Sequence, residues 1–459
     1  MKSLFFSCLY LIVYNNIIAQ SPTFISTNKA SSDIEQMIAT FEKVHYNPYF
    51  KTTKQQFNLK KNELLDSWAK DSISLKQLMV TGMKLSAMMS GGHSNMYWKN
   101  AKIVPEIKEH FYIPFTGKLI DSSQTFIVTK SNIPDIQPGM EIKSINEISI
   151  VKLFKECMTY TGGIDAFKIA NIERIFPLYL FFNDALQAPF SIEIYKSDEI
   201  LLTKGLNINE LLNFVNSGQA QVDYSFEILE QGIGLISYNN CNNYKKFNKF
   251  LKKSFKIIKQ ENIDKIIIDI RENGGGDSGL NDLLLSYITT KPYQQASGRY
   301  WKVSEEAKKA YSENKVYSRM FGKKFMNQYM NTPNQEVIES IDTTGLTHPK
   351  NPKNYFTGKS CILIGSSTFS SANFLADAVK TYNITTLIGT PTGEYTNDFG
   401  EQISFTLQNS NSTVYISSTL DIGANGNDSI MEPVYPDIEV ETDVLEYAIN
   451  WIGKYANKE

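Results

Sequence analysis

Cysteine and histidine are both scarce in this sequence. The 459 residues contain four of each, and the cysteines are widely spaced, at positions 8, 157, 241 and 361. Cys8 lies in an N-terminal apolar segment, and the three cysteines that follow it form no disulfide framework. Without clustered thiols or imidazoles the sequence offers no metal site of the zinc type, so we expect no metal and no cofactor.

The sequence also lacks an excess of charge of either sign. Lysine and arginine number 46 against 48 aspartate and glutamate residues, which gives a net charge of -2. This balance gives no reason to expect nucleic acid or an anionic membrane surface as a partner. The hydrophobic content of 42% includes 25 Tyr and 27 Phe, enough for several aromatic-rich cores, and the length predicts two or three domains.

Long apolar runs are absent, apart from a short one at the N-terminus. Lys2 precedes an apolar stretch that reaches Val13, and small residues follow near Ala19. This pattern is typical of a cleaved secretory signal, so residues 1–19 are expected to be removed, although a buried first helix is the alternative. The stretch is too short for a comfortable membrane span. The sequence therefore predicts a secreted or periplasmic protein with no membrane span after signal removal.

Three regions with different patterns follow. Residues 28–105 carry helical apolar stripes, and residues 106–210 contain short strands separated by turns. In residues 215–456 strands alternate with helices, which predicts a βαβ catalytic core with parallel strands. The fold class is therefore a multi-domain α/β protein. Residues 297–357 are polar, tyrosine-rich and poorly periodic, and they form either a lid or a surface excursion.

Small hydroxyl residues connect an apolar strand to a helix in the C-terminal third of the chain. The strand ends at Gly365, Ser366 to Ser371 follow, and the helix continues at Ala372. At a helix N-terminus, free backbone N–H groups and the helix dipole favour a developing negative charge. The turn therefore suits a serine nucleophile, and serines that only cap the helix are the alternative.

A second strand also ends in an unusual turn. The apolar residues 265–270 run into Arg271-Glu272-Asn273 and then three glycines, at 274, 275 and 276. Consecutive glycines permit positive φ angles and a close approach of the backbone to a ligand, although a flexible turn gives the same pattern.

Together, the two turns resemble those of the S41-type serine peptidases, the C-terminal processing and tricorn-like family. Asp269–Gly276 resembles the family's Asp-Leu-Arg-x-Asn-x-Gly-Gly signature, and Thr368–Ala372 falls where the family carries its nucleophile. The resemblance extends over nearly the whole mature chain. It implies a serine peptidase that hydrolyses peptides or unfolded proteins through an acyl-enzyme.

The resemblance also implies roles for individual residues. Ser370 is the expected nucleophile, and the N–H of Ser371 with that of Gly275 or Gly276 is the expected oxyanion hole. Residues 136–146 are similar to the glycine turn and strand of a PDZ domain, a module that binds an extended chain end, although an ordinary β-turn has the same pattern.

The general base is expected to be a histidine. The processing branch of the family uses a lysine in a Phe-Gly-Lys-Gly turn, but here Phe399-Gly400 is followed by Glu401, and Lys380 is expected to be a surface charge. The tricorn-like branch uses a histidine from the N-terminal region. His93 lies in a segment similar to the Asp-Gly-His-Thr of relatives, with Gly91 in place of the acidic residue. A histidine titrates near neutral pH and can accept the serine proton.

The other three histidines are weaker candidates for the general base. His45 also matches a recurring segment of relatives, but a helix-end residue that packs against the turn before Pro48 is the better interpretation. His110 and His348 lie beside expected loops, and nothing in the pattern favours them.

An acidic partner for the imidazole is the last part of the expected site. Glu432 precedes a Pro-Val-Tyr-Pro-Asp segment, and the tricorn-like site carries a glutamate near a similar Pro-Asp pair, so Glu432 is either the orienting acid or simply exposed. Glu401 ranks second, with a solvated glutamate at a strand edge as its alternative. Two other functions stay open: an inactive peptide- or ligand-binding homologue, and an esterase with the same machinery.

Overall fold

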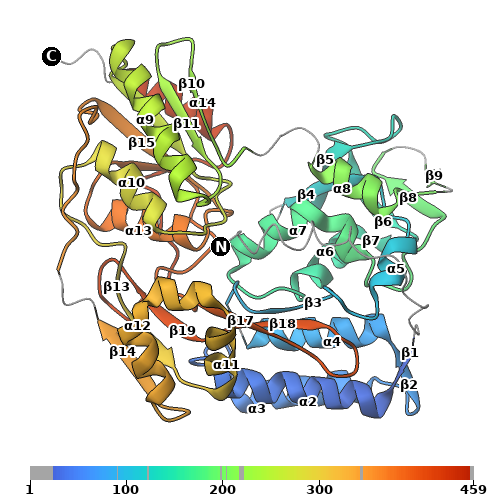
Figure 1. The fold of residues 1–459 in the computed structure, drawn as a ribbon. Helices are drawn as coiled ribbons and strands as arrows, with labels where there is room; N and C mark the ends of the chain where they lie inside the picture. The colour runs from blue at the N-terminus through green and yellow to red at the C-terminus, as the bar shows by residue number, and fades with distance from the viewer. Residues whose placement is uncertain are drawn as a thin grey trace.

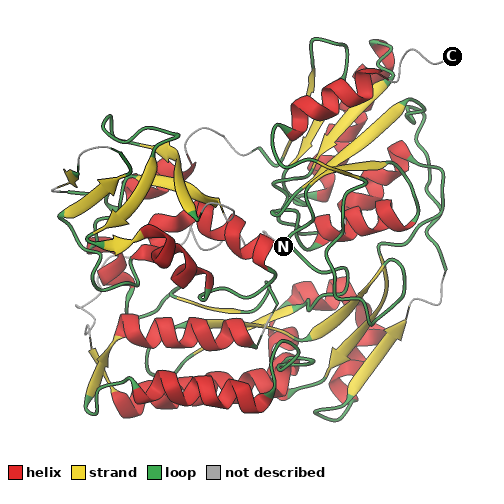
Figure 2. Ribbon diagram, turned by 180° about the vertical axis from the view of Figure 1, so that it is seen from behind, coloured by secondary structure: helices red, strands yellow, loops and turns green. Residues whose placement is uncertain are grey.

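The computed structural model describes residues 24–89, 91–120, 124–196, 199–202, 204–216, 222–341 and 345–454. The expected signal, residues 1–19, lies outside these described residues. Figure 1 and Figure 2 show a helical N-terminal region, a β-rich region beside it, and a sheet flanked by helices that is formed by the C-terminal half. None of the described helices combines the length and the apolar character needed to cross a bilayer.

The N-terminal region is helical, as the apolar stripes predict. Its elements are β1 (Phe24–Ser26), α2 (Thr27–Val44), α3 (Lys54–Asp66), β2 (Ser72–Ser74), α4 (Leu75–Met88) and β3 (Asn95–Tyr97). The stripe of α2 is fully buried at Ile34, Met37 and Phe41. Helix α3 begins with a capping box. The Thr53 side chain accepts the backbone N–H of Gln56, and the Gln56 side chain accepts the backbone N–H of Thr53. The turn after α4 carries His93 toward the C-terminal half.

The second region is built on an antiparallel sheet with the strand order β4-β5-β6-β8-β9. Its strands are β4 (Phe115–Ile120), β5 (Thr125–Ser131), β6 (Glu141–Ile145), β7 (Ile148–Ser149), β8 (Phe190–Ile194) and β9 (Ile200–Leu202). Its helices are α5 (Val104–Glu109), α6 (Ile150–Met158), α7 (Asp165–Leu180) and α8 (Ile208–Asn216). The expected glycine turn before β6 is present at Gly139, whose φ is +91°. The specific likeness to a PDZ domain stays a prediction.

The C-terminal half contains the expected parallel sheet, in the order β10-β11-β12-β15-β16-β20. The strands are β10 (Tyr224–Ile228), β11 (Gly234–Tyr238), β12 (Lys265–Asp269), β15 (Lys359–Ile364), β16 (Thr386–Gly389) and β20 (Ile438–Glu439). The helices around it are α9 (Tyr244–Gln260), α10 (Gly279–Ile288), α13 (Ser371–Thr381) and α14 (Val444–Lys454). Each pair of neighbouring strands from β11 to β20 is parallel, and β10 is an edge strand that pairs antiparallel with β11. The α/β prediction is confirmed.

Helices cover both faces of this sheet, which explains why its strands read as continuous apolar runs. The face toward α9, α10 and α13 and the face toward α14 each form a core of their own. Cys361 in β15 is fully buried in the second core, as expected of a small apolar residue. Since β12 and β15 are adjacent and parallel, with Ile268 opposite Ile362, the turns after both strands lie at one edge of the sheet.

The polar segment after residue 296 is more ordered than its sequence indicates. It forms β13 (Ala296–Lys302), α11 (Glu305–Glu313), α12 (Lys315–Asn331) and β14 (Val337–Ile341), and β13 pairs with β14 and with β19 (Thr419–Gly423). Trp301, Tyr311 and Tyr329 form its buried aromatic centre. The Lys302 ammonium donates to the carbonyl oxygens of Glu42 and His45, at 2.7 and 3.0 Å, so the segment is fastened to α2.

Another sheet joins the N-terminal region to the C-terminal half. It has the order β17-β18-β3, with β17 (Gln402–Thr406) and β18 (Thr413–Ser417), so β3 of the N-terminal region pairs with a C-terminal strand. Asn95 lies opposite Tyr415, and the Ser94 hydroxyl accepts the N–H of Ser417 at 2.9 Å. These contacts hold the residues that follow His93 against the C-terminal half.

Candidate active site

The turn that carries Ser370 is sharp and held on both sides. Ser370 has φ +55° and ψ -125°, a backbone conformation that L-residues rarely adopt. The Thr368 hydroxyl donates to the Ile270 carbonyl at 2.9 Å, and the Phe369 N–H donates to the Asn273 carbonyl at 3.0 Å. The turn after β12 therefore braces the turn after β15. Ser370 stands at the N-terminus of α13, where a strained turn presents its side chain.

The glycine turn lies directly against this serine. A Cβ atom on Gly275 would stand 2.6 Å from the Ser370 Cβ and 2.8 Å from the Ser371 nitrogen, and Gly275 has φ +92°. Only glycine fits a position with both restrictions. The Ser371 hydroxyl donates to the Gly276 carbonyl at 2.7 Å, which ties the two turns together.

Two backbone N–H groups beside Ser370 are free to bind an oxyanion. The Gly275 N–H already donates to the Asn273 side chain at 2.9 Å. In the described part of the chain, the N–H groups of Gly276 and Ser371 have no acceptor. Of the two glycines considered from the sequence, Gly276 is therefore the one whose donor remains available, together with that of Ser371.

Replacing Gly275 with alanine is expected to lower kcat/KM by at least about 100-fold, because the new methyl group displaces the serine from its position. Gly139 is the matched control, since its φ is +91° and a Cβ there meets no atom within 4 Å. Gly139→Ala costs about 1 kcal/mol of stability from backbone strain and leaves the activity of the folded protein unchanged. Urea unfolding of both variants, and assays of the peptide hydrolysis that the family resemblance implies, measure these effects. Equal activity in both variants contradicts the close fit of Gly275 against Ser370.

His93 reaches the same place from the N-terminal region. A Cβ on Gly92 would stand 2.7 Å from the Phe369 ring, so the loop packs closely against the residue before the serine. The His93 ring itself lies 4.8 Å from the Phe369 ring, centre to centre. The Gln402 side chain donates to the His93 carbonyl and fixes the backbone there. The structure therefore places His93 against Phe369, the residue that precedes Ser370.

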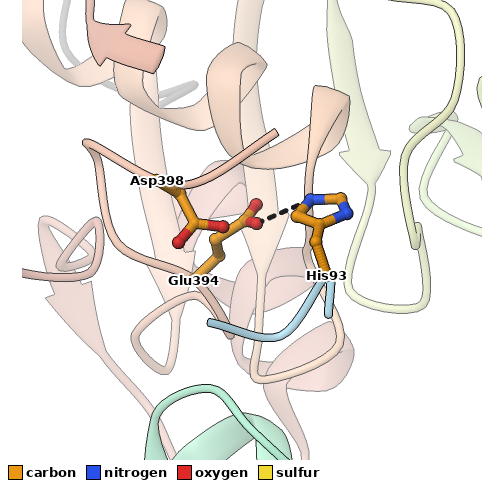
Figure 3. A group of neighbouring side chains, drawn as sticks. All are labelled: His93, Glu394 and Asp398. Atoms are coloured by element: carbon orange, nitrogen blue, oxygen red, sulfur yellow. Dashed lines mark ion pairs between the residues drawn. The ribbon is translucent and has the colours of Figure 1, made fainter. Parts of the chain in front are cut away.

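One carboxylate connects His93 to Ser370. It belongs to Glu394, on the loop after β16, whose Oε1 lies 2.9 Å from His93 Nε2, as Figure 3 shows. Its other oxygen, Oε2, accepts the backbone N–H of Ser370. Among the residues that the structure describes, no donor is aligned with Oε1. The contact is therefore a close approach that becomes an ion pair when the imidazole is protonated.

Glu394 is the site residue that the sequence interpretation missed. The dipeptide Gly-Glu occurs twice in this loop, at Gly393-Glu394 and at Gly400-Glu401, and the second resembles the family's lysine turn. The structure puts the first at the serine. Glu401 instead pairs with Arg299, at 2.7 Å, and its side chain is 12% exposed. The alternative of a solvated glutamate at a strand edge is therefore wrong, since burial and an arginine define its surroundings.

The structure does not bring Glu432 to the imidazole. Glu432 is exposed, and its backbone carbonyl accepts the N–H of Thr396 at 2.7 Å. Within the described ranges its carboxylate has neither a hydrogen bond nor an ion pair. Its role as the orienting acid stays a prediction without a contact to support it.

The remaining candidates lie away from the serine. His45 is fully buried at the end of α2, where its ring packs 4.5 Å from that of Phe399, and burial lowers its pKa to about 3. His110 packs on aromatic rings, and burial lowers its pKa to about 4. His348 is exposed, and Lys380 pairs with Asp437 at the surface.

Burial controls the protonation of the site. Only 18% of the His93 side chain and 5% of the Glu394 side chain are exposed. Burial lowers the pKa of His93 and raises the pKa of Glu394 to about 7. Burial and the adjacent Glu394 carboxylate raise the pKa of Asp398. Near neutral pH the imidazole is therefore uncharged and able to accept a proton.

The same three side chains have the composition of a metal site. His93, Glu394 and Asp398 each offer one ligand atom, and these atoms lie within 4.8 Å of one another. One imidazole and two carboxylates suit a divalent transition ion. The scarcity of histidine in the sequence gave no sign of this grouping.

Comparison with known proteins identifies the class of this core. Residues 232–440, which run from β11 to β20 and include both turns, match the profile of Peptidase family S41. This part of the chain is therefore an S41-type peptidase domain, and the resemblance drawn from the two turns is confirmed. No curated protein matches the sequence.

Two solved structures resemble nearly the whole chain. The structure of mature CPAF complexed with lactacystin has a TM-score of 0.63 at 14% identity, with 93% of this chain and 97% of that chain covered. Mature CPAF gives the same TM-score and identity, with 94% and 99% covered. At this identity the likeness shows the fold alone.

Proposed function

We propose that this protein is a serine peptidase that hydrolyses peptide bonds of peptides or unfolded proteins. The observation that carries the proposal is the single buried carboxylate of Glu394, which contacts the His93 imidazole with one oxygen and the Ser370 backbone with the other. The same carboxylate therefore touches both the expected base and the backbone of the expected nucleophile, and this supports the proposal. A neutral imidazole beside a carboxylate supports proton transfer from serine, because the carboxylate stabilises the imidazolium that forms.

Each residue then has a defined role. The Ser370 hydroxyl attacks the carbonyl carbon of the substrate while His93 takes its proton and returns it to the leaving amine. Glu394 stabilises the imidazolium that forms, in the role that the sequence assigned to Glu432. The N–H groups of Ser371 and Gly276 donate to the oxyanion, and water then hydrolyses the acyl-enzyme.

A fluorophosphonate probe tests the proposal directly, because it labels only an activated serine. We expect labelling of Ser370 in the intact protein and its loss in His93→Ala. Mature CPAF is described in complex with lactacystin. We therefore expect lactacystin to compete with the probe. A folded protein that the probe does not label contradicts the proposal.

The antiparallel domain is proposed to hold the substrate or to gate the site. Phe167 on α7 stacks on Phe369, with 4.6 Å between ring centres and 23° between planes, and it is 4% exposed. A shift of α7 therefore reaches the residue next to Ser370. A chain end added to the edge of this sheet is the expected mode of binding.

Replacing Phe167 with leucine tests this connection. The change keeps most of the buried volume and costs less than about 1.5 kcal/mol of stability. We expect kcat/KM to fall roughly tenfold, because Phe369 loses the ring that holds it beside the serine. Phe154→Leu, a change within the aromatic cluster of the same domain, is the control for stability and is expected to keep full activity. Equal effects of the two changes refute the connection.

We further propose a secreted or periplasmic location, which rests on the basic start, short apolar centre and small residues of residues 1–19. N-terminal sequencing of the exported protein is expected to show cleavage near Ala19.

A catalytically inactive peptide- or ligand-binding homologue is the second candidate. The observation that favours it is that His93 Nε2 faces Glu394, while the Ser370 hydroxyl makes no hydrogen bond within the described residues. The fluorophosphonate probe separates the two candidates, since a binding protein leaves it unreacted. Among active enzymes, a short-chain ester assay beside a peptide library separates an esterase from a peptidase.

A further inference from the structure

The candidate site holds one more buried carboxyl group than the proposed reaction uses. The reaction needs the His93 imidazole and the Glu394 carboxylate, and it gives Asp398 no role. Asp398 and Glu394 are each 5% exposed, and Figure 3 shows the Glu394 carboxyl group between that of Asp398 and the His93 ring. Burial of a carboxylate is unfavourable unless a partner binds it, so the surroundings of this pair indicate what the partner is.

One oxygen of each carboxyl group has no hydrogen-bond donor. Among the described residues, these oxygens are Glu394 Oε1 and Asp398 Oδ2, and both are shielded from solvent. In the same part of the chain neither residue forms an ion pair with a lysine or an arginine. Two shielded oxygens without donors, side by side, are the groups to which a cation binds.

The His93 imidazole supplies a third ligand. Its Nε2 lies 2.9 Å from Glu394 Oε1, and one ligand atom from each of the three side chains falls within 4.8 Å of the other two. A tetrahedral ion with bonds of about 2.1 Å keeps its ligand atoms about 3.4 Å apart, which lies within this range. Small rotations of the side chains therefore suffice to enclose an ion.

Contacts outside the three groups hold each of them in place, as the outer contacts of metal ligands do. The second oxygen of Glu394, Oε2, accepts the Ser370 N–H. The backbone of Asp398 pairs with that of Asp421 in β19 through two hydrogen bonds, of 2.7 and 3.2 Å. The first side chain of β17 donates to the carbonyl of the histidine. The three ligands therefore lie close together before any ion binds.

Gly91 leaves room for the aspartate. A Cβ on Gly91 would stand 2.9 Å from Asp398 Oδ1 and 3.8 Å from Oδ2. The φ of Gly91 lies outside the left-handed range, so its backbone permits other residues. The Asp398 carboxyl group is what excludes a side chain there. A methyl group at position 91 therefore displaces one ligand without changing its chemistry.

The donor set selects the kind of ion. One imidazole and two carboxylates, with no thiolate, suit a divalent transition ion such as Zn²⁺ or Co²⁺. Mg²⁺ and Ca²⁺ instead take oxygen ligands, and more of them than this site offers. Zn²⁺ binds such donors more tightly than Co²⁺, and three protein ligands leave the fourth position of a tetrahedral Zn²⁺ ion to water.

We propose that His93, Glu394 and Asp398 bind one Zn²⁺ ion, and that the bound ion reversibly inhibits the peptidase. The inhibition rests on the proposed function, whereas the binding does not. A neutral imidazole has a single nitrogen lone pair, and an imidazole that has donated it to an ion cannot accept the Ser370 proton. The ion also neutralises the carboxylate that would stabilise the imidazolium. Removal of the ion restores both groups.

Co²⁺ is the probe for binding, because it takes the same ligands as Zn²⁺ and absorbs visible light. Metal-free protein titrated with Co²⁺ is expected to develop a visible band that saturates at one ion per chain and disappears when Zn²⁺ is added. Asp398→Asn replaces a ligand with a neutral amide, so its affinity for Zn²⁺, measured against a chromophoric chelator, is expected to fall at least about 100-fold. His348→Gln and Glu432→Gln alter an exposed imidazole and an exposed carboxylate, and these controls are expected to bind as the native protein does.

Gly91→Ala tests the same geometry with all three ligands present. The methyl group displaces the Asp398 carboxyl, so the affinity for Zn²⁺ is expected to fall about tenfold. In an Asp398→Asn background, where the ligand is already lost, no further fall is expected. Circular dichroism of each variant checks the fold. Additive losses in the double variant contradict the assignment of Asp398 as a ligand.

Fluorophosphonate labelling of Ser370 measures the inhibition. In the native protein, Zn²⁺ is expected to slow labelling at least about tenfold, because the base is occupied, and EDTA is expected to restore it. In Asp398→Asn, the labelling that remains is expected to be the same with and without Zn²⁺ at the concentration that saturates the native site. The ratio of the two rates is taken within one variant, so a change in the folded fraction does not affect it.

Each part of the proposal has its own contrary result. Absence of a Co²⁺ band, or a band that Asp398→Asn leaves unchanged, overturns the site. Labelling of the native protein that saturating Zn²⁺ does not slow, or hydrolysis that requires Zn²⁺ and stops with EDTA, overturns the inhibition. If the folded, metal-free protein is not labelled while Co²⁺ binds as expected, the proposed function is wrong and the metal site stands.

Discussion

Turnover is expected to fall by at least about 10⁴-fold when Ser370 is replaced with alanine, because the substitution removes the nucleophile and leaves only binding and oxyanion stabilisation. The fold is expected to remain, since no hydrogen bond in the described residues involves the Ser370 hydroxyl. Peptide hydrolysis measured by mass spectrometry, beside circular dichroism of the variant, checks both statements. Retention of full peptidase activity by the folded variant refutes the assignment.

Ser371 supplies the matched control for this result. Its hydroxyl donates to the Gly276 carbonyl, and its backbone N–H is one of the two expected oxyanion donors. Ser371→Ala removes the hydroxyl and keeps the N–H. We therefore expect a loss of no more than about tenfold, from weaker contact between the two turns. A larger loss than that of Ser370→Ala would reverse the roles of the two serines.

The Ser370 backbone offers a test of its own. A residue with φ +55° stores strain that glycine does not have, so Ser370→Gly is expected to raise the free energy of unfolding by about 1 kcal/mol relative to Ser370→Ala. Urea unfolding of the two inactive variants measures it. An equal stability for both means that the turn is not strained.

The two turns were predictable because each is encoded by residues next to one another. Glycines after the strand at 265–270 and hydroxyl residues after the strand at 361–364 are local signals. The parallel pairing of β12 with β15 then brings them together without further information. The α/β class followed from the same alternation of strands and helices.

The acidic part of the site was not predictable in the same way. The two Gly-Glu dipeptides of one loop look equivalent in the sequence, and only tertiary contacts distinguish them. Arg299, which comes from the segment after residue 296, binds Glu401, and this leaves Glu394 to meet the histidine. The pairing of β3 with β18, which holds the chain after His93, also joins residues more than three hundred positions apart. No periodicity or spacing encodes such a contact.

Glu394→Gln is expected to abolish the proposed peptidase activity and to stabilise the protein above neutral pH. The amide cannot balance the charge of a protonated His93, so kcat is expected to fall roughly 10³- to 10⁴-fold. Burial raises the pKa of Glu394 in the folded protein to about 7 from 4.5. Between these pH values the folded state holds more protons than the unfolded state, so native stability declines as pH rises through this window. The decline is about 3 kcal/mol, and it is absent in the Gln variant.

Urea unfolding at pH 5 and pH 8 therefore separates two descriptions of this glutamate. In the first description, Glu394 is buried for function and destabilises the native protein once it ionises. The free energy of unfolding of Glu394→Gln, relative to that of the native protein, is then about 3 kcal/mol higher at pH 8 than at pH 5. Glu432→Gln is the control, because an exposed carboxylate is expected to change neither stability nor activity. Should Glu432→Gln lose the activity and Glu394→Gln keep it, the orienting acid is the one that the sequence indicates, and Glu394 only fills space beside Ser370.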